Sequence, residues 1–540
     1  MDKKLFTHFH LPLISRWRRN RLRAIIRGYN RLKLEDQLGL PRQVSTEILE
    51  SHFDKISDNA SRNIFFEAKG SAERAVRQYA FARLCNPTRI SRELAYSRGV
   101  RSAMILPLPR AWQSVLVDHG IRLNHLRCSL AWHVGVVRYL GRGILMIVHL
   151  LVMLVLAQRK KLPSERYVYF AELGQENVPQ LLTGAKSYDI CSWYASWEGK
   201  NGQAAIIKHN VHCEPSRTGS GMLTEYGEPP YLLLRGWINL LRFSGWGLVA
   251  TSVALFDLLR GHWWHALMLG EAARAKAVQL CKTEDLALEY LFHNSGVGYR
   301  PLWTYDAEKR GARVICYHYS TFEQPKMKNG YSTQKYDFGA ANWPLYLVWD
   351  KYQANQYWRE IGPEANVAVV GPIWFSDAPD DVRIPEDSIG VFNVDPWRIG
   401  LHLPISTIGN YAADHPDFNA RFLEDIQQVL TEHSLTMAWK KKRDIGERLR
   451  KADRQVHKKL ATKKNVVVIP PSISAIRLVD ACQGTISIPF TSTALFRREE
   501  KMPSIYYDPT GWIQRDDRGA HGIPIVVGID ELRQWVGSTF

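Results

Sequence analysis

The sequence lacks the cysteine patterns that mark a disulfide framework or a zinc site. Its seven cysteines are odd in number, widely separated and include no C-x-x-C pair. It also lacks low-complexity segments, internal repeats and the glycine-rich or proline-rich composition of fibrous and disordered chains. These absences indicate a globular protein of a reducing compartment, and 540 residues suffice for about two to four domains.

Most signatures of nucleotide and nucleic-acid binding are missing as well. The chain has no G-x-x-x-x-G-K-[ST] loop, and the G-V-G at 296–298 is too short for a dinucleotide fingerprint. Zinc-finger spacing, an aromatic RNA-binding strand signature and a heptad zipper are also absent, so we expect no nucleic-acid partner. No D-x-D triplet is present, so we expect no metal ion, and basic side chains would stabilise a leaving phosphate.

The excess of positive charge is confined to two segments. Of the net charge of +18, residues 1–33 and residues 438–464 contribute +9 each. The first segment shows no secretory signal, because a short apolar stretch with a proline is followed by five arginines. Apolar residues between these arginines predict a helix that lies on an anionic membrane surface, with a nucleic-acid arm as the alternative.

Two apolar regions raise the question of membrane contact. Gly143–Ala157 is apolar apart from His149 and has basic residues on both sides, but 15 residues are fewer than the about 20 of a bilayer span. Residues 231–269 mix tryptophan, leucine and arginine, which is typical of a headgroup boundary. An interfacial or re-entrant helix is the leading interpretation of 143–157. Burial in a core and a true span are the alternatives, and a buried helical hairpin is the alternative for 231–269.

Strand-like segments begin only after residue 163. Residues 1–163 predict a basic, helical, membrane-associating region. Short β-branched and aromatic runs then alternate with helices over 164–375, with a helical insertion at about 230–285. An acidic, proline-rich linker at 376–387 precedes a second such series over 388–540. The predicted fold class is α/β, with two Rossmann-like domains facing a cleft, because alternating strands and helices favour parallel sheets.

Two segments of the second series predict a phosphate site. Hydroxyls follow the strand 484–490, at the start of a predicted helix that continues through Ala494–Arg497, and a basic run follows the strand 435–439. The alternatives are a simple helix cap and a solvated basic face. The residues concerned are Thr491, Ser492, Thr493, Lys440, Lys441, Lys442 and Arg443.

The segment 486–512 resembles a known family. IPFTSTALF and KMPSIYYDPTG, with WKKKR before them and RGAHGIPIVVGIDELRQWV after, are similar to the bacterial surface-polysaccharide biosynthesis proteins named for their PFTS motif. HNSGVGYRPLW at 293–303 and YHYSTFE at 317–323 extend the resemblance to about 165–536.

The resemblance implies a GT-B-type glycosyltransferase of two Rossmann-like domains. It would move a sugar from a nucleotide-sugar donor to a glycan or lipid-linked glycan acceptor in O-antigen, capsule or related assembly. Its expected place is the cytoplasmic face of the bacterial inner membrane, peripheral or monotopic, with no cofactor besides the nucleotide-sugar. The alternatives are another sugar-nucleotide enzyme, such as a 2-epimerase, and a non-catalytic membrane-bound component of an assembly complex.

On this implied function, the strand ends of the first domain offer the base and the acceptor site. Candidate general bases are Glu172, Glu176 and His318, because each has the chemistry to accept a proton from an acceptor hydroxyl. Asp395 is a candidate for the donor sugar, and Asp508 either binds ribose or caps a turn. The candidate acceptor-binding residues are Asn294, Ser295, Arg300, Tyr319 and Ser320.

Overall fold

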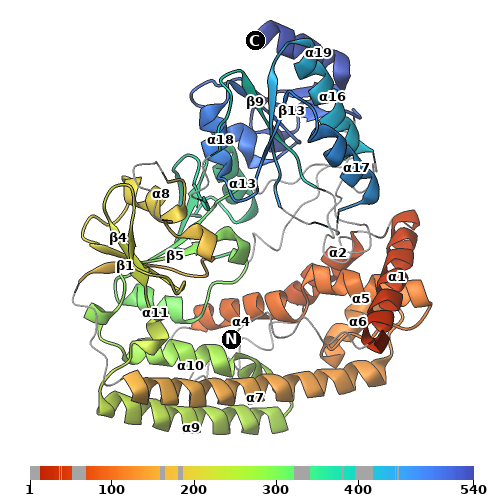
Figure 1. The fold of residues 1–540 in the computed structure, drawn as a ribbon. Coiled ribbons are helices and arrows are strands. Elements are labelled where there is room, and N and C mark those ends of the chain that lie inside the picture. Colours follow the sequence, from red (N-terminus) through yellow and green to blue (C-terminus); the bar gives the residue numbers. More distant parts are fainter. Residues whose placement is uncertain are drawn as a thin grey trace.

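The chain folds into two α/β domains and a helical region below the first of them (Figure 1). The computed structural model describes residues 12–35, 37, 39–51, 69–157, 165–180, 187–321, 341–378, 382–395, 417–443, 446, 449–511 and 513–540.

The first domain is built on an eight-stranded sheet. Its strands are β1 (Tyr167–Phe170), β2 (Ile206–His209), β3 (Ser216–Arg217), β4 (Leu223–Tyr226), β5 (Glu289–His293), β6 (Arg313–Tyr317), β7 (Leu345–Val348) and β8 (Val367–Val369). Their order is β3-β4-β2-β1-β5-β6-β7-β8, and every neighbouring pair is parallel except β3 and β4. All four residues of β1 and of β2 are buried, because helices or loops cover both faces of a parallel sheet. The short helices of this domain within the described residues are α8 (Ile190–Ser196), α11 (Trp303–Lys309) and α13 (Lys351–Glu360).

The second domain carries a six-stranded, wholly parallel sheet. Its strands are β9 (Ser388–Phe392), β10 (Thr436–Lys440), β11 (Val466–Ile469), β12 (Gly484–Ser487), β13 (Ser504–Asp508) and β14 (Ile525–Val527). They lie in the order β11-β10-β9-β12-β13-β14. The helices around them are α16 (Phe418–Glu432), α17 (Lys451–Leu460), α18 (Ala475–Ala481) and α19 (Gly528–Thr539).

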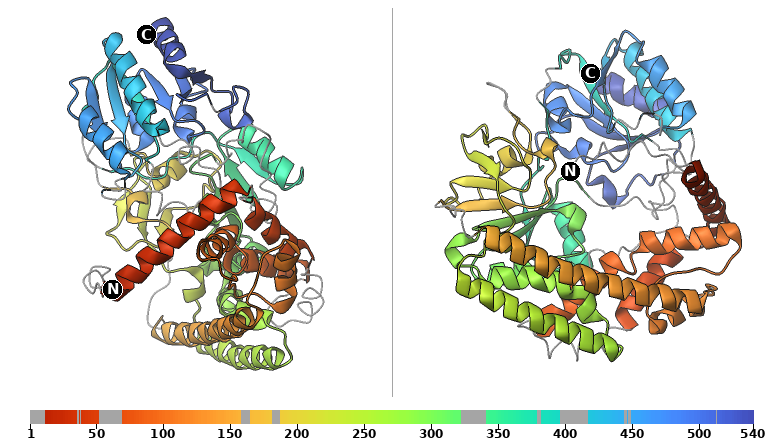
Figure 2. Two further views of the ribbon diagram at one scale, coloured as in Figure 1. Left: turned by 90° about the vertical axis from the view of Figure 1, so that its right-hand side faces the viewer. Right: turned by 60° about the horizontal axis from the view of Figure 1, so that its bottom comes forward.

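The helical region has contributions from two parts of the chain. The N-terminal part supplies α1 (Pro12–Leu34), α2 (Leu40–Ser51), α4 (Lys69–Arg83), α5 (Pro87–Val100), α6 (Arg110–Asp118) and α7 (His125–Ala157). An insertion between β4 and β5 supplies α9 (Trp237–Leu259) and α10 (Trp264–Leu280). Helices α7 and α9 lie side by side in the outermost layer, and α10 lies between them and the sheet (Figures 1 and 2).

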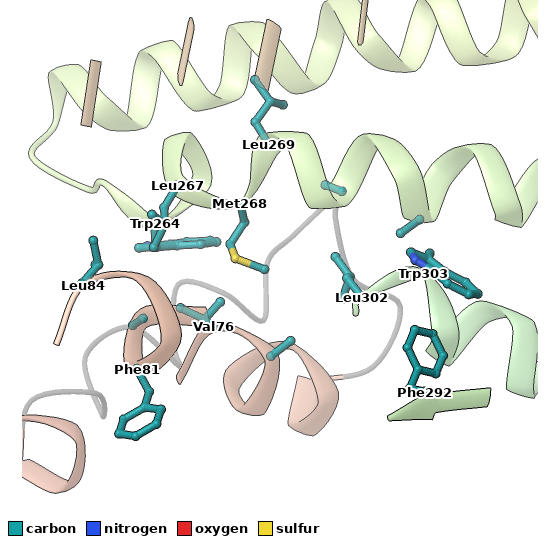
Figure 3. Close-up of a cluster of buried hydrophobic side chains, with 14 of the residues drawn as sticks. Val76, Phe81, Leu84, Trp264, Leu267, Met268, Leu269, Phe292, Leu302 and Trp303 are labelled. Atoms are coloured by element: carbon teal, nitrogen blue, oxygen red, sulfur yellow. The ribbon is translucent and has the colours of Figure 1, made fainter. Parts of the chain in front are cut away.

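The helical region and the first sheet share one hydrophobic core. Val76 of α4 and Leu84, directly after that helix, face Trp264, Leu267 and Met268 of α10 (Figure 3). Phe81 of α4 belongs to the same cluster but points away from α10, and Phe292 of β5 and Trp303 of α11 lie at the other end. Leu269 of α10 points the opposite way, toward α7, where it lies against Gly143. The N-terminal helices are therefore an integral part of the first domain rather than an appended arm.

Helix α1 uses its apolar side inside the molecule. Ala24, Ile25 and Leu32 are buried, and α1 crosses α5 at such short distance that a Cβ atom on Gly28 would stand 1.6 Å from the Ala95 carbonyl oxygen. The sequence predicted that this apolar side would enter a membrane surface. In the folded chain it is occupied by α5, because burying it against another helix removes it from water equally well.

Helices α7 and α9 keep an apolar side exposed. Both are long and apolar enough to cross a membrane, judged by length and composition alone. On α7 the exposed residues recur at helical spacing and include Leu130, Val134, Val137, Leu145, Val148 and Val152. On α9 they include Ile238, Leu241, Leu248, Leu255 and Leu259. We call the two rows together the apolar stripe. The run 143–157 is thus part of a 33-residue helix that is buried on one side only.

The carboxyl ends of the two sheets face each other. Trp349, directly after β7, packs on Phe496 of the second domain with ring centroids 5.1 Å apart. Asp350 accepts hydrogen bonds from Arg498 at 2.8 Å and from His521 at 2.9 Å. Ligands of parallel sheets bind beyond these ends, so this arrangement defines where the functional groups are to be sought.

The predicted fold class is confirmed: two Rossmann-like α/β domains in a GT-B-like arrangement follow a helical N-terminal region. Two local features differ from the prediction. The short strands β3 and β4 were not foreseen, and the helix expected after Thr491 is only a 3-10 turn over Ser492–Leu495.

Candidate functional site

A cavity of about 440 Å³ lies at the carboxyl edge of the first sheet, and we call it the sheet-edge cavity. Ala171 and Glu172 after β1, Asn210 after β2, and His293 at the end of β5 contribute from the sheet side. Helices α4 and α10 close it from the helical region through Arg83, Glu271 and Arg274. Titratable side chains of both signs therefore meet in one concave site, which favours binding or catalysis there.

Of the three predicted bases, Glu172 is the one that lines this cavity. Its side chain is 68% exposed, and its carboxylate lies 3.8 Å from Nε2 of His293. The Ser295 backbone N–H donates to Nδ1 of His293 at 3.3 Å, so Nε2 carries the ring proton and faces Glu172. Burial lowers the pKa of His293, and the nearby Glu172 offsets this only in part. A neutral imidazole beside the carboxylate leaves Glu172 free to accept a proton.

The backbone around Glu172 is held in an unusual conformation. Glu172 has a φ of 62°, in the left-handed region that residues other than glycine, asparagine and aspartate seldom adopt. The next residue, Leu173, is fixed through both its N–H and its carbonyl by the amide of Asn210, at 2.7 and 3.0 Å. Asn177 accepts the Gly174 N–H at 2.7 Å. These bonds hold the loop so that the Glu172 carboxylate stands at the cavity.

Sequence reasoning missed the basic side of this cavity. Arg274 donates to Glu271 at 2.7 Å, the Tyr299 hydroxyl donates to the second oxygen of Glu271 at 2.7 Å, and Arg83 of α4 also lines the cavity. Arg83 lies on α4 and Arg274 in the insertion, far from the strand ends in sequence. No local spacing links them, so only the shared core reveals that they belong to one site.

His318 does not act as a base in this structure, contrary to the prediction. It is fully buried between β6 and α13, where Gln353 Nε2 lies 3.1 Å from Nδ1 and the Tyr357 hydroxyl lies 2.5 Å from Nε2. Burial lowers its pKa to about 3. The side chain is a core element that an acceptor hydroxyl does not reach.

Glu176 and Arg300 also lie outside the cavity. Glu176 is exposed, with its carboxylate folded over Gly174. Arg300 was predicted to bind the acceptor, but it is buried beneath the surface, where it donates to Thr304 at 2.9 Å and pairs with Glu308. Its positive charge is therefore paired within the first domain and does not face the cavity.

The remaining predicted acceptor residues do not line the cavity, but Ser295 lies between its lining residues His293 and Gly296, and Tyr319 lies with its ring centroid 5.9 Å from that of His293. The hydroxyls of Ser295 and Tyr319 are 3.0 Å apart, and Phe375 stacks on Tyr319 with ring centroids at 4.1 Å. Ser320 is half-buried and its carbonyl accepts from Gln353 at 3.3 Å. Asn294 is fully buried, and its amide makes no hydrogen bond within the described residues. Ser295 and Tyr319 thus remain candidates for an acceptor, whereas Asn294 does not reach the surface.

In the second domain the two segments predicted to bind phosphate follow strands that end at the same height in the sheet. Ser487 of β12 and Lys440 of β10 both pair with Phe392 of β9, which lies between them. The loop after β12 and the basic run after β10 therefore start on either side of the end of β9. This register brings the hydroxyls and the cations to the same edge, as the sequence predicted.

The hydroxyls of the loop after β12 differ in what they bond to. Thr491 donates to the Ile488 carbonyl at 2.9 Å, and the hydroxyls of Thr493 and Ser487 are 2.9 Å apart. The half-buried hydroxyl of Ser492 makes no hydrogen bond with any described residue. Ser492 is thus the hydroxyl of the motif that is most available to a ligand.

The basic run divides into a buried and an accessible part. Lys440 is buried and donates to the Pro471 carbonyl at 3.2 Å, and burial lowers its pKa to about 8. Lys441 is half-buried, with Nζ 5.4 Å from the ring of Trp439, and Lys442 and Arg443 are exposed. Lys440 therefore holds the loop near Pro471, and the cations left for a ligand are Lys441, Lys442 and Arg443.

Two predicted donor aspartates are engaged within the protein. Asp508 accepts hydrogen bonds from the Thr510 N–H, the Thr510 hydroxyl and the Ile513 N–H, so it caps a turn, which is one of its two predicted roles. Asp395 is buried, accepts from Asn393 at 2.9 Å and lies 3.2 Å from His457. Among the residues that the structure describes, no three His, Cys, Asp or Glu side chains gather in a manner suited to a metal ion.

A match to a family model assigns the chain to a protein family. The family model for polysaccharide biosynthesis PFTS motif proteins matches residues 248–536, which is more than half of the chain. The chain belongs to this family. The PFTS family segment thus begins inside α9 and includes α10, the carboxyl edge from β5 onward and the second domain up to residue 536 in α19. No curated protein matches the sequence.

Solved structures of similar outline include enzymes of sugar-nucleotide metabolism. The UDP-GlcNAc 2-epimerase of Methanocaldococcus jannaschii, in complex with UDP-GlcNAc and UDP, shares 9% identity at a TM-score of 0.34 over 69% of this chain and 92% of its own. The UDP-N-acetylglucosamine 2-epimerase of Rickettsia bellii shares 8% at 0.33 over 69% and 87%. The S. aureus MnaA structure with UDP gives the same four values.

Proposed function

We propose that this PFTS family protein is a glycosyltransferase, which moves a sugar from a nucleotide-sugar to a precursor of a surface polysaccharide such as O-antigen or capsule. The observation that carries the proposal is the pairing of two edges. The exposed carboxylate of Glu172 stands at the carboxyl edge of one sheet, and the Ser492 hydroxyl with its neighbouring cations stands at the carboxyl edge of the other. Glycosyl transfer needs a base on the acceptor side and charge stabilisation on the donor side.

The proposed reaction assigns each part a task. The acceptor hydroxyl lies in the sheet-edge cavity and loses its proton to Glu172 as its oxygen bonds to the anomeric carbon. The bond from that carbon to the donor phosphate breaks, and the nucleotide leaves with the electron pair. Ser492 with Lys441 and Arg443 stabilises the charge on the leaving phosphate, and Ser295 with Tyr319 orients the acceptor.

The proposed place of action is the cytoplasmic face of the bacterial inner membrane. The apolar stripe supports it, because exposed arginines lie beside it. They are Arg127, Arg138 and Arg142 on α7, Arg242 on α9, and Arg260 directly after α9. Apolar side chains beside arginines suit the boundary between anionic headgroups and acyl chains. We propose that both helices lie along the membrane surface and do not cross the bilayer, since each packs one side against α10.

The decisive experiment incubates the full chain with UDP-, GDP- and CMP-sugars, with and without a membrane extract that supplies acceptors. Glu172→Gln is expected to bind the donor as the wild type does but to transfer sugar about 100-fold more slowly or worse, because the base contributes that much. Glu176→Gln is the matched control, since its carboxylate lies outside the cavity, and it should transfer at the wild-type rate. Epimerised donor without transfer would identify the protein as an epimerase instead.

We further propose that the reaction needs no divalent metal ion. The support for this proposal is the group of accessible cations after β10, which can stabilise the charge on the leaving phosphate themselves. Transfer is therefore expected to continue at an unchanged rate in EDTA. Complete loss in EDTA that manganese or magnesium restores would overturn this expectation.

A further inference from the structure

A second cavity adjoins the sheet-edge cavity on the side of α7, and we call it the helix cavity. It encloses about 670 Å³ between α4, α7 and α10, with Arg142, Leu145 and His149 on its α7 wall. The residues that line both cavities are Ala82, Arg83, Glu271 and Arg274. The two cavities therefore meet at a common junction between α4 and α10.

The junction and the helix cavity carry an excess of positive charge. Arg83 and Arg142 are both exposed, and neither forms an ion pair with a residue of the described part of the chain. Arg274 pairs with Glu271, but its buried Nε has no hydrogen-bond partner within that same part. The helix cavity is thus lined by three guanidinium groups and one carboxylate, which only Arg274 pairs with. Guanidinium groups are suited to bind phosphate oxygens two at a time.

The helix cavity opens beside the apolar stripe. Leu145 belongs to both, since it lines the helix cavity and is 68% exposed on the outer side of α7. Val148, about one turn further along, is exposed as well. A ligand with a phosphate among the arginines can therefore keep a hydrocarbon chain on the stripe without passing through water.

We infer that the two cavities form one binding passage for a lipid-linked phosphate, with the phosphate or diphosphate of a long-chain alcohol held by Arg83, Arg142 and Arg274. The hydrocarbon chain leaves past Leu145, and the end that accepts the sugar reaches the sheet-edge cavity beside Glu172. This inference rests on the proposed transfer reaction and names its acceptor class. A soluble neutral glycan has no group that would engage three arginines next to an apolar surface.

The test measures binding of the full chain to nanodiscs of neutral phosphatidylcholine. Three sets contain equal mole fractions of polyisoprenyl phosphate, the uncharged polyisoprenol or phosphatidylglycerol, so that a specific lipid phosphate is separated from an ordinary headgroup. The wild type should bind best to the polyisoprenyl phosphate. Arg83→Gln and Arg142→Gln should each weaken that binding about tenfold, the loss expected for one hydrogen-bonded charge contact.

Arg138→Gln provides the matched control, because Arg138 is exposed on α7 one turn before Arg142 but lines neither cavity. It removes the same charge and should leave the preference for polyisoprenyl phosphate unchanged. Equal losses for Arg138→Gln and Arg142→Gln, or equal binding to phosphatidylglycerol, would overturn the inference. Hydrolysis of the nucleotide-sugar by water, measured without any lipid, tests the proposed enzyme independently of this passage.

Discussion

Two side chains that follow strands of the first sheet show how burial decides chemistry. Glu172 after β1 is exposed at a cavity, whereas His318 after β6 is sealed between Gln353 and Tyr357. Both follow buried aromatic strands, so the sequence offers them as equal candidates. The difference arises from α13, which covers the end of β6 and leaves the end of β1 open.

The buried histidine predicts a specific weakness toward acid. Since the pKa of His318 is about 3 in the folded state and about 6.5 in the unfolded state, only the unfolded chain binds the proton between these values. The free energy of unfolding should therefore fall as pH drops below about 6.5, by up to about 1.4 kcal/mol per pH unit from this residue. In His318→Asn that part of the slope should be absent, as denaturant titrations from pH 7 to pH 4 would detect.

The same variant separates a core residue from a catalytic one. At pH 7.5, His318→Asn should be less stable by about 1–3 kcal/mol, because Tyr357 and Gln353 lose a buried partner. Its transfer rate per folded molecule should equal that of the wild type. A loss of transfer of about 100-fold in a fully folded variant would restore His318 as a base.

At the scale of single elements, α7 joins two environments along one helix. One side packs on α10, where Gly143 allows an approach so close that a Cβ atom would lie 2.6 Å from Cβ of Leu269. Gly141, two residues earlier, has no atom within 4 Å of such a Cβ. The two glycines therefore serve different purposes although they stand in the same sequence context.

This contrast gives a matched pair of substitutions. Gly143→Ala should destabilise the protein by about 1–3 kcal/mol through overpacking against α10. Gly141→Ala should be neutral or stabilising by up to about 1 kcal/mol, because alanine favours the helix and meets open space. Thermal unfolding in the absence of lipid measures both. A shift in the same direction for both variants would contradict the assigned packing of α7.

Strand positions were predictable because a buried parallel strand needs a short run of apolar residues. Such runs at 166–173, 388–394 and 435–439 became β1, β9 and β10. The residues predicted to bind phosphate were predictable for the same reason, since they lie in the loops that follow two of the strands. The arginines of α4 and α10 were not predictable, because their meeting depends on helix packing between distant segments. Helix α1 shows the same limit, since its partner α5 is invisible to a local hydrophobic pattern.

At the scale of the whole molecule, the apolar stripe and the exposed arginines of α7 and α9 predict a mixed mode of membrane binding. The full chain should sediment with anionic vesicles at 0.1 M salt and be only partly released at about 1 M, because screening shortens the Debye length from about 10 Å to about 3 Å. Leu248→Glu on the stripe should weaken sedimentation at both salt concentrations. Val369→Glu alters an equally apolar exposed residue on β8 and should have no effect.

Complete solubility of the wild type at low salt, or equal effects of these two substitutions, would contradict the membrane prediction. A fragment that begins near residue 164 is not a suitable control. Such a fragment lacks α4, and without α4 the side chains of Trp264 and Met268 on α10 would lose their packing partner and become exposed.

The shared core also sets the order in which the chain can fold. Gln78 of α4 is hydrogen-bonded to the Arg300 backbone N–H and to the Asn342 side chain, which are separated from it by 222 and 264 residues. During synthesis α1 and α5 can cover each other early, but α4 lacks these partners until the strands of the first sheet have left the ribosome. Contacts of such long sequence separation slow folding, and a slowly folding chain with exposed apolar residues tends to aggregate. Early binding of α7 to a membrane would remove part of this apolar surface from water and so reduce aggregation of the nascent chain.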